Sequence, residues 1–148
     1  MASPGTPALA LCFCADPAEL KTVRDKVRDV LVQAGADAKT AADVVIAVNE
    51  ACMNIIQHAY KGDCSGEISL RIHNNGGQIE IELQDRAAPV DCSSIKPRPI
   101  EELRPGGLGT YFIQEIMDDC VYGNLQDGAG NFLRMTKRVG PPARQRRS

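Results

Sequence analysis

Residues 67–85 read EISLRIHNNGGQIEIELQD, and this stretch decides the fold class. Apolar and polar side chains alternate strictly on both sides of a central turn, which places the apolar set on one face of a strand. The turn itself, NNGG at residues 74–77, is a strong signal for a tight hairpin. The stretch therefore predicts two antiparallel strands with one buried face. The residues on that face are Ile68, Leu70, Ile72, Ile79, Ile81 and Leu83.

The segment before the hairpin predicts one strand and two helices. The apolar run at residues 8–14 predicts the strand. Asp16 is followed by proline at the first helical position and by glutamate three residues after the cap, a pattern that begins a helix. Gly35 ends this first helix. Asp37 can cap a second helix, which we expect to run to about Tyr60.

The segment after the hairpin begins with a long stretch that has no period. Residues 85–107 carry four prolines, and a loop of this length inside a compact domain is usually a functional lid or binding loop. A third helix is expected to begin near Leu108. Two strands, at about residues 120–125 and 131–137, close the domain.

This order of elements predicts an α/β fold: a two-layer α/β sandwich with a mixed, mostly antiparallel sheet and helices on one face. A doubly wound fold is excluded because it requires strands and helices in alternation. We expect the domain to span residues 8–139, with residues 1–7 and 140–148 as flexible termini.

The composition of the 148 residues excludes several classes of protein. Hydrophobic residues make up 43% and charged residues 24%, an ordinary globular mixture. No apolar run approaches the ~20 residues that cross a bilayer, and the N-terminus lacks the features of a signal peptide. We therefore expect a cytoplasmic protein without a membrane partner. The 17 basic and 19 acidic residues, with no Trp, give no surface suited to nucleic acid.

The six cysteines do not form a metal or redox motif. Only Cys12 and Cys14 lie close together, and their C-x-C spacing differs from the C-x-x-C of zinc and redox sites. Their apolar surroundings predict small, buried packing residues. We expect all six cysteines to be reduced and structural.

The second helix carries a polar stripe made of Glu50, Asn54 and His58, each four residues from the next. One interpretation is the solvated face of an amphipathic helix. However, the flanking residues Ala47 and Ala51 are small, and a solvated face usually carries Lys and Arg. The other interpretation is chemical, because an Asn oxygen can bind Mg²⁺ while a carboxylate orients or deprotonates an attacking group.

Two further features point to a ligand. Asp85 stands where an apolar strand ends, either as a strand-terminating residue or as an acceptor for the exocyclic amine of a purine. The run RPGGLGT at residues 104–110 precedes a helix, where glycines allow close approach and helix N–H groups can bind phosphate. It is not a P-loop, since no Gly-Lys-Ser/Thr follows.

Taken together and in this order, these features resemble the GHKL ATPase family, and most closely its small anti-sigma factor switch kinases, which are serine-protein kinases. The resemblance covers about residues 8–139. Its most specific pieces are VNEACMNIIQHAY at 48–60, LRPGGLG at 103–109 and IMDD at 116–119, while LRMTK at 133–137 fits the last strand.

The resemblance implies ATP and Mg²⁺ as cofactors and assigns roles to matching positions. Glu50 would be the general base for a serine hydroxyl, and Asn54 the Mg²⁺ ligand. His58 would orient the site or pack, Asp85 would bind the adenine amine, and Arg104 would meet the γ-phosphate. The full set of implied ATP-binding residues is Asn54, His58, Asp85, Ala87, Arg104, Gly106, Gly107, Leu108, Gly109 and Thr110.

Ala87 departs from the family pattern, which has glycine there. The added methyl group lies where the backbone would pass the adenine, and it disfavours a positive φ. A degenerate nucleotide site therefore stays open as an alternative.

The implied function is that of an anti-sigma factor and serine kinase. The chain would sequester a sigma factor and phosphorylate a STAS-type anti-anti-sigma protein with Mg-ATP, and we expect a homodimer that binds no nucleic acid. Arg24, on the polar side of the first helix, is the candidate partner contact, although a solvated arginine is the alternative. The competing interpretations are a non-catalytic sigma-binding module and, less favoured, a detached sensor histidine kinase domain.

Overall fold

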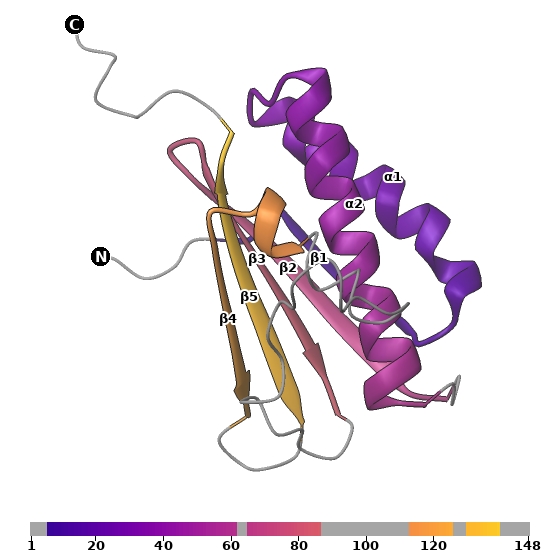
Figure 1. The fold of residues 1–148 in the computed structure, drawn as a ribbon. Coiled ribbons are helices and arrows are strands. Elements are labelled where there is room, and N and C mark those ends of the chain that lie inside the picture. The colour runs from indigo at the N-terminus through magenta and orange to yellow at the C-terminus, as the bar shows by residue number, and fades with distance from the viewer. Residues whose placement is uncertain (1–5, 62–64, 87–112, 126–129, 140–148) are drawn as a thin grey trace, which may run out of the picture.

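The computed structural model describes residues 6–61, 65–86, 113–125 and 130–139, which form a sheet covered on one face by helices (Figure 1). The sheet order is β1-β2-β3-β5-β4, and every neighbouring pair is antiparallel. The predicted two-layer α/β sandwich is confirmed. The strands are β1 (Leu9–Cys14), β2 (Glu67–Asn75), β3 (Gln78–Asp85), β4 (Asp119–Asn124) and β5 (Asn131–Arg138).

The predicted hairpin is formed by β2 and β3, in a register that pairs Leu70 with Leu83 and joins the strands through a two-residue turn. Gly76 and Gly77 have φ values of 65° and 90°, which favour glycine. The alternating apolar residues of both strands are fully buried, as the sequence pattern predicted. They form the floor on which the helices pack.

Both described long helices begin near their predicted caps, and α1 ends before Gly35 as predicted. A short 3-10 turn, η1 (Pro17–Glu19), is capped by the Asp16 side chain and leads into α1 (Leu20–Gln33). Gly35, at φ 98°, follows α1 and allows the chain to reverse. The carboxylate of Asp37 accepts the Thr40 N–H at 2.7 Å and begins α2 (Ala38–Asn54).

Both helices pack their apolar faces on the sheet, and α2 is the more deeply buried. Valines, alanines and a cysteine of α2 belong to the same core cluster as apolar residues of α1 and the strands, which fixes the rotation of this helix about its axis. That rotation in turn fixes where its polar residues point. The buried residues of α2 are Ala41, Val44, Val45, Ala47, Val48, Ala51 and Cys52.

The end of α2 differs from the expected regular helix. The helical run reaches Tyr60, but its last turn is a π-helix, η2 (Ile55–Ala59), closed by a hydrogen bond of 2.9 Å from the Tyr60 N–H to the Ile55 carbonyl. Single π turns inside helices are rare and frequently occur at functional sites. Just beyond the π turn, the Tyr60 side chain makes hydrogen bonds to the backbone of Glu67 and Arg86.

The expected burial of Cys12 and Cys14 is wrong. Both thiols are exposed, while Leu11 and Phe13 alternate with them and pack against the core. β1 is an edge strand of a sheet with helices on only one face, so every second side chain of the strand faces away from them. Of the third helix, only residues 113–116 are described.

Candidate functional site

Glu50 and Asn54 lie one turn apart near the end of α2, and both are half-buried. The buried face of α2 turns them away from the core, and the small buried residues Ala47 and Ala51 stand beside them. His58 lies beyond them, in the π turn, and is exposed. A π turn holds more residues than an α turn, so the predicted stripe is regular from Glu50 to Asn54 but not as far as His58.

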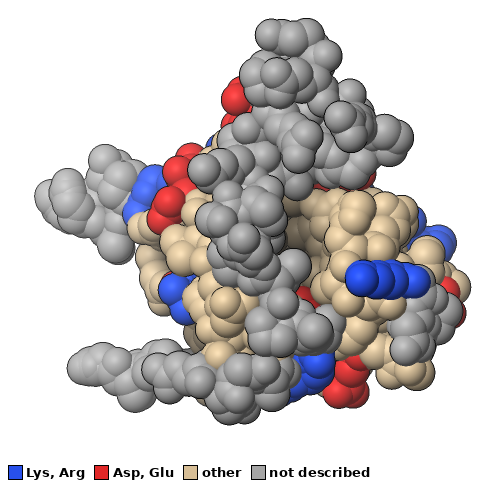
Figure 2. Space-filling view, turned by 60° about the horizontal axis from the view of Figure 1, so that its bottom comes forward, with Lys and Arg blue, Asp and Glu red and all other residues tan. Residues whose placement is uncertain are grey.

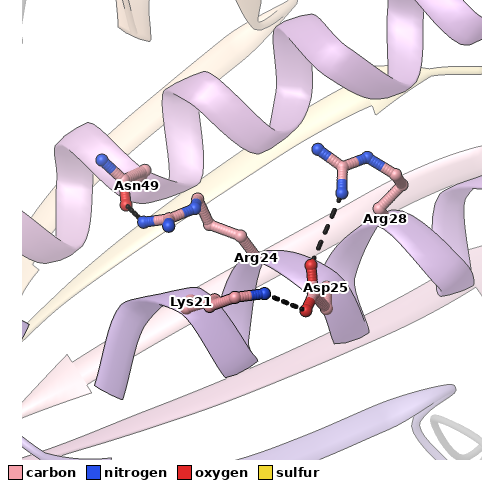
Figure 3. A network of polar contacts seen from close by, with 5 residues as sticks. All are labelled: Lys21, Arg24, Asp25, Arg28 and Asn49. Carbon is pink, nitrogen blue, oxygen red and sulfur yellow. Dashed lines mark hydrogen bonds and ion pairs between the residues drawn. The ribbon is translucent and has the colours of Figure 1, made fainter. Parts of the chain in front are cut away.

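A groove of about 390 Å³ runs between α1 and α2 and reaches Glu50. One wall carries two guanidinium groups, and the other carries an exposed isoleucine, Ile46. Arg24 donates from Nη1 to the side-chain oxygen of Asn49 at 3.0 Å, so this arginine is held toward α2 rather than extended into solvent (Figure 3). The lining residues are Arg24, Arg28, Ala42, Val45, Ile46, Asn49 and Glu50.

Arg28, which lines the groove, belongs to a chain of ion pairs on α1. Asp25 forms ion pairs with Lys21 at 3.4 Å and with Arg28 at 3.6 Å (Figure 3). All three side chains are about half exposed or more, so these pairs contribute little to stability. They place both signs of charge on the exposed side of α1.

Asp85, at the end of β3, is a buried carboxylate with only 4% of its surface exposed. The side-chain amide of Asn131 on β5 donates to its Oδ1 at 2.9 Å, and the oxygen of that amide accepts from Asn124 at 2.8 Å. Gly130 passes so close that an added Cβ would clash with the Asp85 carbonyl oxygen. The side chain and backbone of Asp85 are thus both held by the neighbouring strand.

Tyr60 connects the end of α2 to the end of β3. Its hydroxyl donates to the Glu67 carbonyl at 2.6 Å and accepts the backbone N–H of Arg86 at 2.7 Å. Arg86 directly follows Asp85, so one side chain ties the helix that carries Glu50 and Asn54 to the strand end that carries Asp85. The motif quoted from the sequence ends on Tyr60, but nothing in that motif indicated this contact.

Asn131 is the other site residue that the sequence did not reveal. Its position directly across from Asp85 follows from the pairing of β3 with β5, two strands separated by 45 residues of chain. The one local signal is a polar residue just after a glycine-rich turn, which is too common to single it out.

Seven of the predicted ligand residues lie outside the described part of the chain: Ala87, Arg104, Gly106, Gly107, Leu108, Gly109 and Thr110. Figure 2 shows the end of the molecule where α2 and β3 finish, and the described surface there is hollowed and mostly uncharged. Within the described ranges, no three His, Cys, Asp or Glu side chains gather as a metal site. A single Asn oxygen still suits Mg²⁺, because this ion is usually held by one or two protein ligands together with substrate phosphates.

The comparisons with known proteins decide the family. Residues 13–137 match the model of the histidine kinase-like ATPase domain. Serine-protein kinase RsbW from Oceanobacillus iheyensis is 32% identical over 84% of this chain and 82% of its own length, and RsbW from Bacillus subtilis is 30% identical over 83% and 80%. This chain belongs to the histidine kinase-like ATPase family, in its RsbW serine-protein kinase branch.

A further relative and a solved structure are also similar to this chain. RsbW from Bacillus cereus strain G9842 is 37% identical over 66% of this chain, and the chain spans 63% of that relative's length. The crystal structure of the RsbU and RsbW domains of Rv1364c from Mycobacterium tuberculosis has the same fold, with a TM-score of 0.61 at 22% identity, over 93% of this chain and 34% of that one.

The assignment confirms the family and the enzyme class that the motifs predicted, a protein-serine/threonine kinase that uses ATP. Among the residues that the structure describes, no helix is both long and apolar enough to cross a membrane.

Proposed function

We propose that this protein transfers the γ-phosphoryl group of Mg-ATP to a serine of a STAS-type anti-anti-sigma protein and that it sequesters a sigma factor in its alternative complex. The observation that carries the proposal is the position of Glu50. It lies one turn from Asn54, and it also lines the groove between the two helices. A base for this reaction must face both the nucleotide and the protein substrate.

In the proposed reaction, Glu50 accepts the proton of the serine hydroxyl as that oxygen attacks the γ-phosphorus, and ADP leaves. The products are phosphoserine and ADP. Asn54 would hold Mg²⁺ through its side-chain oxygen, and Mg²⁺ when bound would neutralise phosphate charge. Most of the catalysis then comes from positioning and electrostatics rather than from covalent chemistry.

The nucleotide contacts at the other end of the site belong to the same proposal. Asp85 accepts a hydrogen bond from the adenine amine, and Asn131 holds the Asp85 carboxylate in place. Arg104 would contact the γ-phosphate, His58 would orient the site or pack, and the glycine-rich run 106–110 would supply backbone N–H groups to the phosphates.

The groove lined by Arg24 is the proposed partner surface. Arg24 and Arg28 offer donors for carboxylates, while Ile46, 47% exposed, offers an apolar contact beside them. A partner with an acidic residue next to an aliphatic one fits this surface, and its serine would approach Glu50 at the groove's end. A homodimer and a cytoplasmic location complete the proposal, because a sigma factor acts inside the cell.

Ala87 favours a second function, a sigma-binding module without turnover. Its methyl group stands where the family has glycine next to the adenine. The two functions differ in a simple measurement, because the module would bind sigma factor without transferring phosphate.

The test is phosphate transfer from radiolabelled ATP to the cognate STAS protein. Glu50→Gln keeps the size of the side chain but cannot accept the proton, so we expect transfer to fall at least about 100-fold while ADP affinity is kept. Glu19→Gln, an exposed glutamate at the start of α1, is the matched control. Transfer at the parent rate by Glu50→Gln would remove Glu50 as the base. Sigma binding without any transfer by the parent protein would favour the module.

A further inference from the structure

The Tyr60 hydroxyl lies where a direct hydrogen bond between β2 and the chain at the end of β3 would be expected. The β2–β3 pairing runs from Asn75 with Gln78 to Ile68 with Asp85. One step further, Glu67 lies opposite Arg86. In an antiparallel ladder, opposed pairs alternate between hydrogen-bonded and non-hydrogen-bonded, and counting from the two-residue turn makes this next pair a bonded one.

A direct bond from the Arg86 N–H to the Glu67 carbonyl is therefore expected, and the structure has a bridge instead. The N–H donates to the Tyr60 oxygen at 2.7 Å, and the Tyr60 hydroxyl donates to the carbonyl at 2.6 Å. The phenol oxygen stands between the two strands, so they part at this point. Asp85 is the last residue before they separate.

The surroundings of Tyr60 hold its ring in this position. Tyr60 directly follows the π turn, and its side chain reaches the backbone of Glu67 and Arg86. The ring lies against Gly66, where an added Cβ would come within 2.5 Å of two ring carbons. A side chain at position 66 would displace the ring, so glycine at this position leaves room for it.

We infer that Tyr60 is a positioning residue for the adenine end of the nucleotide site. Its hydroxyl acts as a wedge that stops the β2–β3 ladder at Asp85 and directs the chain after Asp85 away from β2. Ala87, at the glycine position of the family pattern, is the second residue beyond Asp85. The inference rests on the proposed role of Asp85 in binding adenine, and it adds that this role depends on a side chain of α2.

A wedge and a merely structural contact predict different results for Tyr60→Phe. Without the hydroxyl, Arg86 and Glu67 can bond directly, and the ladder extends by one pair. That new bond offsets the two lost ones, so the urea midpoint should change little. The strand end, however, moves toward β2. We expect ADP affinity to fall about three- to tenfold, the range that one hydrogen bond's free energy supports.

The experiment measures calorimetric binding of ADP and of GDP to the full chain. Because Tyr60 acts at the adenine end of the site, Tyr60→Phe should lower the ratio of ADP affinity to GDP affinity. In an Asp85→Asn background, Tyr60→Phe should change ADP affinity by less than about twofold further, since both substitutions act on the contact between residue 85 and the base. Tyr122→Phe, which removes a hydroxyl from β4, is the matched control.

A second variant moves the ring and keeps the hydroxyl. Gly66→Ala places a methyl group against the Tyr60 ring, so it should lower ADP affinity in the same direction. If Tyr60→Phe lowers the urea midpoint but binds ADP as tightly and as selectively as the parent, the wedge is wrong and Tyr60 is only structural. If the parent protein itself fails to bind ADP, the proposed function falls and this inference falls with it.

Discussion

At the scale of single residues, the Mg²⁺ dependence of ADP affinity tests the role of Asn54 separately from the roles of the other site residues. Its side chain lies half-buried at the end of α2, one turn after Glu50. Asn54→Ala removes the proposed Mg²⁺ ligand, so we expect ADP affinity in excess Mg²⁺ to fall to the value that the parent shows in EDTA. The ADP affinity of the parent protein should itself fall at least about tenfold without Mg²⁺, because the ion links phosphate oxygens to the protein.

Calorimetry with ADP, in MgCl₂ and in EDTA, measures both effects. Gln33→Ala removes an exposed amide from the end of α1 and should leave both affinities unchanged. A parent protein that binds ADP equally with and without Mg²⁺ would exclude Asn54 as a metal ligand.

At the scale of elements, the N-terminus of α2 can be weakened without touching the site at its other end. Asp37 caps the helix, and the hydrogen bond from Thr40 lowers the pKa of its carboxyl below the ordinary value of 3.8. A depressed folded-state pKa means that the stabilisation is present above the unfolded pKa and is lost as the pH falls through the folded one.

We therefore expect Asp37→Ala to lower the urea midpoint at about pH 7, and Asp37→Asn, which keeps a cap acceptor, to lower it less. The difference in urea midpoint between the parent and Asp37→Asn should become smaller as the pH falls below about 4. ADP affinity of the folded variants should equal that of the parent. A gap that stays constant down to about pH 3 would show that the charge of Asp37 contributes nothing.

The same element scale explains which features the sequence could predict. The hairpin and the caps at Asp16 and Asp37 depend on residues a few positions apart, so local patterns were sufficient. Asn131 and Tyr60 act through partners that only strand pairing and helix packing bring near. The predicted burial of Cys12 and Cys14 was wrong for a related reason, since burial on a strand depends on whether a second layer covers that face.

At the scale of the whole molecule, Cys52 reports on opening of the core. It is fully buried in the middle of the layer between α2 and the sheet, and burial raises the pKa of its thiol to about 12. Alkylation therefore requires the domain to open. Cys12 is exposed on the sheet face away from the helices, although a hydrogen bond with Glu67 raises its pKa and slows its reaction.

A ligand that binds only the folded domain must slow every reaction that proceeds through unfolding. If the nucleotide site spans α2 and β3 as proposed, ADP at about 100 times its Kd should slow the alkylation of Cys52 about 100-fold, which corresponds to ~2.7 kcal/mol. Cys12 should react at the same rate with and without ADP. Peptide mass spectrometry after timed iodoacetamide pulses separates the two. Unchanged labelling of Cys52, in a protein that binds ADP by calorimetry, would show that α2 opens locally and that the helix does not share the stability of the nucleotide site.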